Sequence, residues 1–163
     1  METKFYHYTH NQALSDILES GHVKLATASA YKKEKPVAWV SSNPHWENTA
    51  TKMVHDGKGN FQHLTFKQQF ESIGCTRIEI NSKILYTWAK LRHKTHMHPI
   101  VADSMEKVGI QQGANPKEWL GSLYPIHKKH WLGIEIFKDG EWKKFEIENA
   151  RKFLKLELQS LAL

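Results

Sequence analysis

The order of apolar and polar residues near the start of the chain predicts a strand followed at once by a helix. Residues 4–9 are largely aromatic and predict a short strand, and residues 11–21 place apolar side chains at spacings of three and four residues, as one face of a helix requires. Thr9 or Asn11 is expected to cap the start of this helix. His7 is therefore expected where the strand turns into the helix, a position at which side chains tend to face a cleft.

Further along the chain, apolar runs alternate with turn and capping residues, which predicts a mixture of strands and helices. Strands are expected over residues 22–25, 37–42, 76–80, 130–137 and 141–147. Helices are expected over residues 45–53, 66–73, 82–91 and 104–108, and residues 148–163 are expected to form a helix or a tail. Arg77 and Glu79 alternate with isoleucines, so we expect both charged side chains to point outward from a half-buried strand. Asp139 and Gly140 give the strongest local hairpin signal, and residues 56–60 predict a hairpin or an exposed loop.

The composition indicates a single folded domain over residues 1–163. Apolar residues make up 40% of the chain, and nine glycines and five prolines are too few for a disordered or low-complexity sequence. Cys75 is the only cysteine and has no partner for an internal disulfide, so we expect a reducing, cytoplasmic location and a buried thiol rather than a nucleophile. No membrane association is expected, because no long apolar run is present. We also expect a monomer.

The net charge is +6, and most of the excess lies in the second half of the chain. Residues 83–163 hold fourteen Lys or Arg against nine Asp or Glu, whereas residues 1–82 hold nine against eight. Basic clusters attract polyanions through counterion release, so DNA or RNA is an expected partner, although an ordinary solvated basic face has the same composition. The candidate nucleic-acid-binding residues are Lys90, Arg92, Lys94, Lys128 and Lys129.

Three histidines, His93, His96 and His98, lie close enough in the sequence to converge on one metal ion. Arg92 and Lys94 would repel a divalent cation, and no cysteine or nearby carboxylate completes a known zinc pattern. We therefore expect no metal here, and we interpret this segment as a basic loop that meets phosphate.

Two later segments form, together with His7, an ordered pattern of polar residues. Ser41 and Ser42 end a predicted strand, and Trp46 follows them closely. Glu118 is followed by an apolar pair, a short loop, a Pro-Ile step and a further predicted strand. This order, with the opening His-Tyr-Thr strand, helix and short strand, resembles the ADP-ribosyltransferase-like superfamily, and especially its DarT-like and RNA 2′-phosphotransferase-like branch.

The resemblance spans residues 5–137 and implies an α+β fold with a split β-sheet and flanking helices. It also implies a cleft that binds NAD, in which Glu118 stabilises the positive charge that develops on the ribose and His7 holds a ribose hydroxyl. Tyr31 or Trp46 would stack on the nicotinamide ring, and Ser41 or Ser42 would support Glu118 or the nicotinamide amide. The cofactor-binding residues that the resemblance implies are His7, Tyr8, Thr9, Tyr31, Ser41, Ser42 and Trp46.

Two features of the sequence depart from the family pattern. Pro116 lies two residues before Glu118, where a central strand disfavours proline. In addition, no glutamine or glutamate stands at that position, as it would in an arginine-modifying enzyme. The rival carboxylates are Glu79, Glu135, Glu146 and Glu148.

Three functional hypotheses follow from the sequence. The first is an NAD-dependent ADP-ribosyltransferase that acts on nucleic acid or on a protein. The second is a basic nucleic-acid-binding module without catalysis. The third, with the least support, is a metal-dependent hydrolase built on the three histidines.

Overall fold

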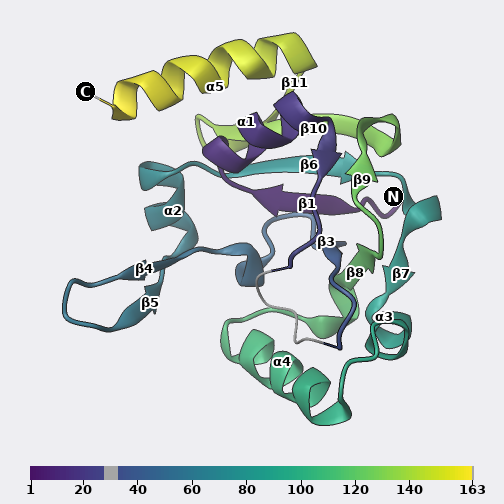
Figure 1. Cartoon of the computed structure of the whole chain (residues 1–163). Coiled ribbons are helices and arrows are strands. Elements are labelled where there is room, and N and C mark those ends of the chain that lie inside the picture. The colour runs from purple at the N-terminus through teal and green to yellow at the C-terminus, as the bar shows by residue number, and fades with distance from the viewer. Residues whose placement is uncertain (28–32, 163) are drawn as a thin grey trace.

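An antiparallel seven-stranded sheet organises the computed structural model, which describes residues 1–27 and 33–162. The strand order is β11-β10-β6-β1-β3-β8-β7 (Figure 1). In chain order these strands are β1 (Tyr6–Thr9), β3 (Ala38–Ser41), β6 (Thr76–Ile80), β7 (Tyr86–Thr87), β8 (Trp119–Ser122), β10 (Trp131–Lys138) and β11 (Glu141–Phe145). Two small sheets lie apart from it, β2 (His22–Val23) with β9 (Ile126–His127) and β4 (Met53–His55) with β5 (Phe61–His63). The chain is therefore a single-domain α+β fold.

Helices cover both faces of the large sheet. They are α1 (Asn11–Ser20), α2 (Phe66–Ser72), α3 (Trp88–Lys94), α4 (Pro99–Gln111) and α5 (Ile147–Leu161), with 3-10 turns η1 (Asn48–Ala50), η2 (Ser82–Ile84), η3 (Pro116–Glu118) and η4 (Lys128–His130). On one face α1 and α5 lie next to each other and bury Leu14 and Leu154 against Ile78 of β6 (Figure 1). These three side chains have no exposed surface, so they lie at the centre of the largest apolar cluster.

Two further clusters bury the opposite face. Beside β8, Trp88 of α3 and Ala102 of α4 pack on Trp119. Beside β6 and β10, an aromatic cluster contains Trp46 and Cys75. Cys75 is fully buried, which confirms the prediction of a buried thiol, and this burial raises the pKa of the thiol to about 12.

The large sheet divides between β1 and β3. The two strands are in register at one pair only, Tyr6 with Ser41, whereas β1 pairs with β6 at four positions. One half of the sheet is thus β11-β10-β6-β1 and the other is β3-β8-β7. The two halves separate beyond Tyr6, and this separation positions the cleft described below.

Several elements lie where the sequence predicts them. Helix α1 ends at Gly21, which adopts the left-handed conformation at φ 75°. The hairpin between β10 and β11 turns at Asp139 and Gly140, both with positive φ, as a two-residue turn of this type requires. Residues 56–60 join β4 and β5 as a hairpin, and residues 66–72 form α2 with a capping box between Thr65 and Gln68. The C-terminal segment is a helix.

Three predicted helices differ from the structure. Residues 45–53 contain the turn η1 and the first residue of β4 but no α-helix, because the Asn43 side chain accepts the amides of His45 and Trp46 and Glu47 is buried. Residues 82–91 split into η2, β7 and α3, since residues 86–87 pair with the edge of β8. The helix predicted over residues 104–108 begins earlier, at Pro99, and runs to Gln111.

Two side-chain predictions were also wrong. Neither Thr9 nor Asn11 caps α1: His10 is the N-cap residue, without a side-chain hydrogen bond. Arg77 is buried at 6% exposure and Glu79 is half-buried, because aromatic residues cover this face of β6. The guanidinium donates to Glu135 and to the carbonyl of Pro44. Alternation therefore identified the two faces of β6 but not that both are covered.

Candidate active site

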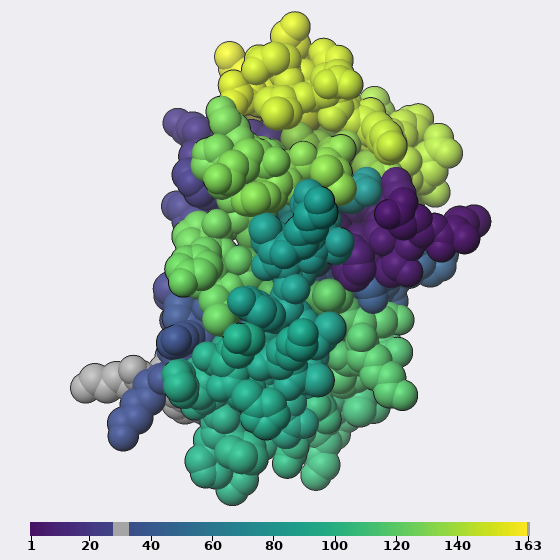
Figure 2. Space-filling model, turned by 90° about the vertical axis from the view of Figure 1, so that its right-hand side faces the viewer, coloured from purple at the N-terminus to yellow at the C-terminus, as the bar shows by residue number. Residues whose placement is uncertain are grey.

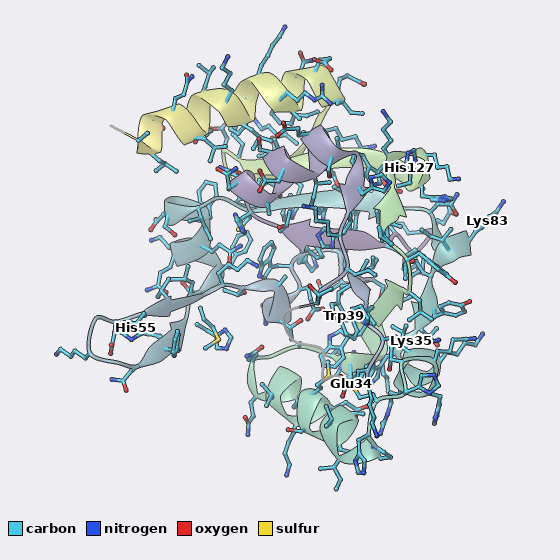
Figure 3. All side chains as sticks on the ribbon, in the orientation of Figure 1. Glu34, Lys35, Trp39, His55, Lys83 and His127 are labelled. Atoms are coloured by element: carbon cyan, nitrogen blue, oxygen red, sulfur yellow. The ribbon has the colours of Figure 1, made fainter. Side chains whose placement is uncertain are left out.

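The division of the sheet opens a cleft of about 1090 Å³. Its walls come from β1 and β3, from α1 and β2 on one side, and from α4 and the segment Glu47–Lys52 on the other. Figure 3 shows Trp39, Glu34 and Lys35, which line the cleft, between β3 and α4. The cleft is larger than the roughly 300–1,000 Å³ typical of sites for drug-sized ligands, so it has room for a dinucleotide.

His7 occupies the point where the two strands part. Its Nδ1 lies 2.8 Å from the carbonyl oxygen of Trp39, and since a carbonyl can only accept, Nδ1 carries the proton and donates it. Burial lowers the pKa of His7, and the positive charge of Lys52 acts in the same direction, whereas the hydrogen bond to Trp39 opposes them. His7 is therefore neutral at pH 7, and its Nε2 is left as a hydrogen-bond acceptor in the wall of the cleft.

A buried carboxylate, Glu47, also lines the cleft. Its Oε2 accepts from Ser41 Oγ at 2.7 Å, and its Oε1 accepts from Thr49 Oγ1 at 2.7 Å and from Trp119 Nε1 at 3.2 Å. The amide of Asn43 donates in turn to Ser41 Oγ at 3.1 Å. The donors to Glu47 therefore come from β3, η1 and β8, and together they hold its carboxylate in one orientation.

The sequence did not single out Glu47. The predicted helix over residues 45–53 gave no reason to place this side chain inside the protein. The available signal was its position six residues after Ser41 and next to Trp46, in a segment where a polar residue follows the end of a buried strand.

The structure brings Ser41 to the cleft but not Ser42 or Glu118. Ser42 donates its amide to the carbonyl of Glu118 at 2.9 Å, so the two residues meet through the backbone beyond the end of β3. The Glu118 side chain is half-buried, and its Oε2 has no hydrogen-bond partner within residues 1–27 and 33–162. Ser41 therefore supports Glu47 rather than Glu118. The rival carboxylates Glu79, Glu135, Glu146 and Glu148 are likewise absent from the described wall of the cleft.

The remaining predicted cofactor residues are divided between the cleft and the core. Tyr8 and Thr9 line the cleft. Trp46 does not, because it packs between Tyr8 and Phe66 and donates its Nε1 to Thr51 Oγ1 at 3.0 Å. Tyr31 lies outside the described residues. Trp39 is the aromatic residue of β3 that the structure adds to the wall.

The predicted nucleic-acid-binding residues lie outside the cleft. Arg92 is engaged by Asp103 at 2.7 Å and by Glu106 at 3.0 Å, so its charge is already neutralised. Lys90, Lys94, Lys128 and Lys129 are exposed.

The histidine segment does not gather around a single point. His98 caps α4 by accepting the amide of Ile100 at 3.2 Å, while His93 and His96 are exposed. Within the described part of the chain, no three His, Cys, Asp or Glu side chains are placed to hold a metal ion.

Across residues 1–27 and 33–162, no helix is long and apolar enough to span a membrane. Comparison with protein-family models, with curated proteins and with solved structures found no match to this chain.

Proposed function

We propose that this chain is an NAD-dependent ADP-ribosyltransferase, with the split-sheet architecture that the sequence resemblance implies. One observation carries the proposal: the cleft between β1 and β3 holds a neutral histidine, His7, and a fixed buried carboxylate, Glu47, on its wall. An enzyme that breaks a glycosidic bond needs this combination, a hydrogen-bonding group for the sugar and a negative charge beside it.

The chemistry follows from where charge develops. Release of nicotinamide from NAD builds positive charge on the ribose, so a carboxylate held in place before the reaction lowers the barrier. Glu47 supplies this charge, and the donors from Ser41, Thr49 and Trp119 keep it oriented. Nε2 of His7 accepts a ribose hydroxyl and thereby positions the sugar.

Other cleft residues suit the remaining parts of a dinucleotide. Lys24, Lys35 and Lys52 line the cleft and provide positive charge for a pyrophosphate. Trp39 offers an aromatic face for a planar ring. The acceptor, nucleic acid or protein, then enters beside the ribose. The exposed lysines outside the cleft favour nucleic-acid binding, the second hypothesis. The two functions are compatible in one protein.

The first test is release of nicotinamide from NAD by the purified protein, with NAD binding measured in parallel by calorimetry. Glu47→Gln is expected to lower kcat roughly 100-fold or more, because it removes a charge needed in the transition state, while NAD binding changes much less. His7→Ala is expected to weaken NAD binding as well as turnover, since it removes a contact made before the reaction.

Glu118→Gln is the matched carboxylate control, and it also tests the prediction made from the sequence. A loss on Glu118→Gln with full activity in Glu47→Gln would move the catalytic role back to Glu118. A wild-type protein that neither binds NAD nor releases nicotinamide would overturn the proposal. Circular dichroism and thermal unfolding of each variant separate these outcomes from misfolding.

A further inference from the structure

Five exposed lysines on one side of the molecule have no carboxylate partner within the described residues. Lys83 belongs to η2, Lys90 and Lys94 belong to α3, and Lys128 and Lys129 belong to η4. The eight ion pairs found in residues 1–27 and 33–162 engage other cations, including Arg92 of the same α3. An unpaired ammonium group on the surface remains available to an external anion.

Two contacts place the segments that carry these lysines next to one another. The amide of Asn81 donates to the carbonyl of His130 at 2.9 Å, which ties the start of η2 to the end of η4. Below this point, Lys94 Nζ lies 4.7 Å from the centre of the Tyr86 ring at the start of β7. Figure 2 shows the teal residues of η2, β7 and α3 beside the brighter green segment around residue 130, and Figure 3 places Lys83 and His127 on this same side. We call Lys83, Lys90, Lys94, Lys128 and Lys129 the basic stripe.

An exposed aromatic side chain, Tyr124, lies on the segment that leads from β8 through β9 to Lys128 and Lys129 of η4. Tyr124 is 76% exposed and lies in the turn between β8 and β9, where Ser122 Oγ bonds both its amide and its carbonyl. Strands β7 and β8 are antiparallel, with Tyr86 opposite Gly121. The turn after β8 therefore lies at the end of the pair that is nearer to η2. An exposed ring on a fixed turn beside lysines combines the two elements that bind single-stranded nucleic acid, a stacking surface and positive charge.

We propose that the basic stripe binds the phosphate backbone of single-stranded nucleic acid, with a base stacked on Tyr124. Neither Tyr124 nor any lysine of the stripe lines the cleft, so this surface is separate from the candidate active site. The inference does not depend on NAD cleavage. The proposed nucleic-acid-binding residues differ from those expected from the sequence. Lys83 and Tyr124 are added, and Arg92 is left out because Asp103 and Glu106 already engage it.

The experiment measures binding of a fluorescent 20-nucleotide single strand and of its duplex by anisotropy at several salt concentrations. The stripe variant, Lys83→Gln with Lys128→Gln and Lys129→Gln, is expected to bind at least about tenfold more weakly at low salt. Its slope of log affinity against log salt is expected to be shallower by about 2, since each lost phosphate contact on a single strand accounts for roughly 0.7. Tyr124→Ala is expected to weaken single-strand binding by roughly fivefold or more without changing the slope.

The control variant removes the same charge elsewhere, by Lys144→Gln, Lys152→Gln and Lys155→Gln on β11 and α5, at the opposite end of the sheet (Figure 1). Equal weakening by the control variant would overturn the proposal, because net charge alone would then account for binding. Duplex binding as tight as single-strand binding would overturn it as well, and so would stripe-dependent binding to phosphatidylserine vesicles without stripe-dependent binding to the oligonucleotide. Glu47→Gln is expected to bind the strand like wild type, which separates this result from the fate of the proposed enzyme activity.

Discussion

At the scale of single residues, Arg77 of β6 contacts the segment that leads to Glu47. Its Nε donates to Glu135 at 2.8 Å and its Nη1 donates to the carbonyl of Pro44 at 2.6 Å, while the rings of Tyr6 and Trp142 lie on either side of the guanidinium. Pro44 belongs to the segment that leads to Glu47. Arg77 thus holds this segment against β1 and β6 through contacts made inside the protein.

Replacing Arg77 is expected to destabilise the fold strongly. Arg77→Met leaves Glu135, which is 8% exposed, without its partner, and breaking a buried pair in this way costs about 3–5 kcal/mol. The free energy of unfolding, measured by urea denaturation, checks this. The double variant Arg77→Met with Glu135→Leu should recover much of the loss, because no carboxylate then remains buried and unpaired. Similar losses in the single and double variants would show that the stacking on Tyr6 and Trp142 matters more than the pair.

Arg77 also shows where prediction from sequence ends at this scale. The alternation in residues 76–80 correctly predicted a strand with two different faces. It could not predict that aromatic residues from β1 and β11, distant in the sequence, would bury the charged face. Glu47 was missed for the same reason, since its donors come from Ser41, Thr49 and Trp119 and only the folded chain brings Trp119 near. The place of His7 in a strand just before a helix was predicted because this order of elements is local, whereas its hydrogen bond to Trp39 was not.

At the scale of elements, α4 forms one wall of the cleft and packs closely on β8 at Gly109. Gly109 lies against the ring of Trp119, and a Cβ at this position would stand 2.5 Å from Trp119 Cζ2. Trp119 in turn donates to Glu47, so the seating of α4 is linked to the candidate carboxylate. The sequence predicted a helix here but placed its start five residues late, because the capping role of His98 ahead of Pro99 was not recognised.

Gly109→Ala separates helix propensity from packing. Propensity alone would stabilise α4 by up to about 1 kcal/mol, because alanine favours a helix over glycine. The contact with Trp119 predicts the opposite sign, a loss of about 1–3 kcal/mol, because the added methyl group forces the helix away from a packed ring. Thermal or urea unfolding gives the sign directly, and a red shift of tryptophan fluorescence would report the displaced ring. A stabilised variant would mean that α4 shifts on β8 without strain.

At the scale of the whole molecule, the sequence predicted the α+β class and the uneven charge, but not how the two halves of the sheet separate. Hydrophobic periodicity assigns strands one at a time and carries no register between strands. The single pair joining Tyr6 to Ser41 and the insertion of His7 beyond it are properties of the assembled sheet. His7 lines the cleft in that assembly, and the pKa values of His7, His10 and His127 are lowered in the folded chain, so the stability of the fold depends on pH.

Acidification is expected to destabilise the protein below about pH 6.5. Burial is the first cause that lowers the pKa of His7, His10 and His127, so the unfolded chain takes up protons that the folded chain excludes. Their contribution to stability is complete above the unfolded pKa and is lost as the pH falls through and below it. For the buried His7 this loss is at most about 1.4 kcal/mol per pH unit. Urea denaturation from pH 8 to pH 5 measures this slope. His7→Asn keeps a donor for the Trp39 carbonyl but cannot titrate, so its stability should fall less steeply than that of wild type. Parallel slopes would show that His7 is not held neutral, and the assignment of Nε2 as an acceptor in the cleft would fail with it.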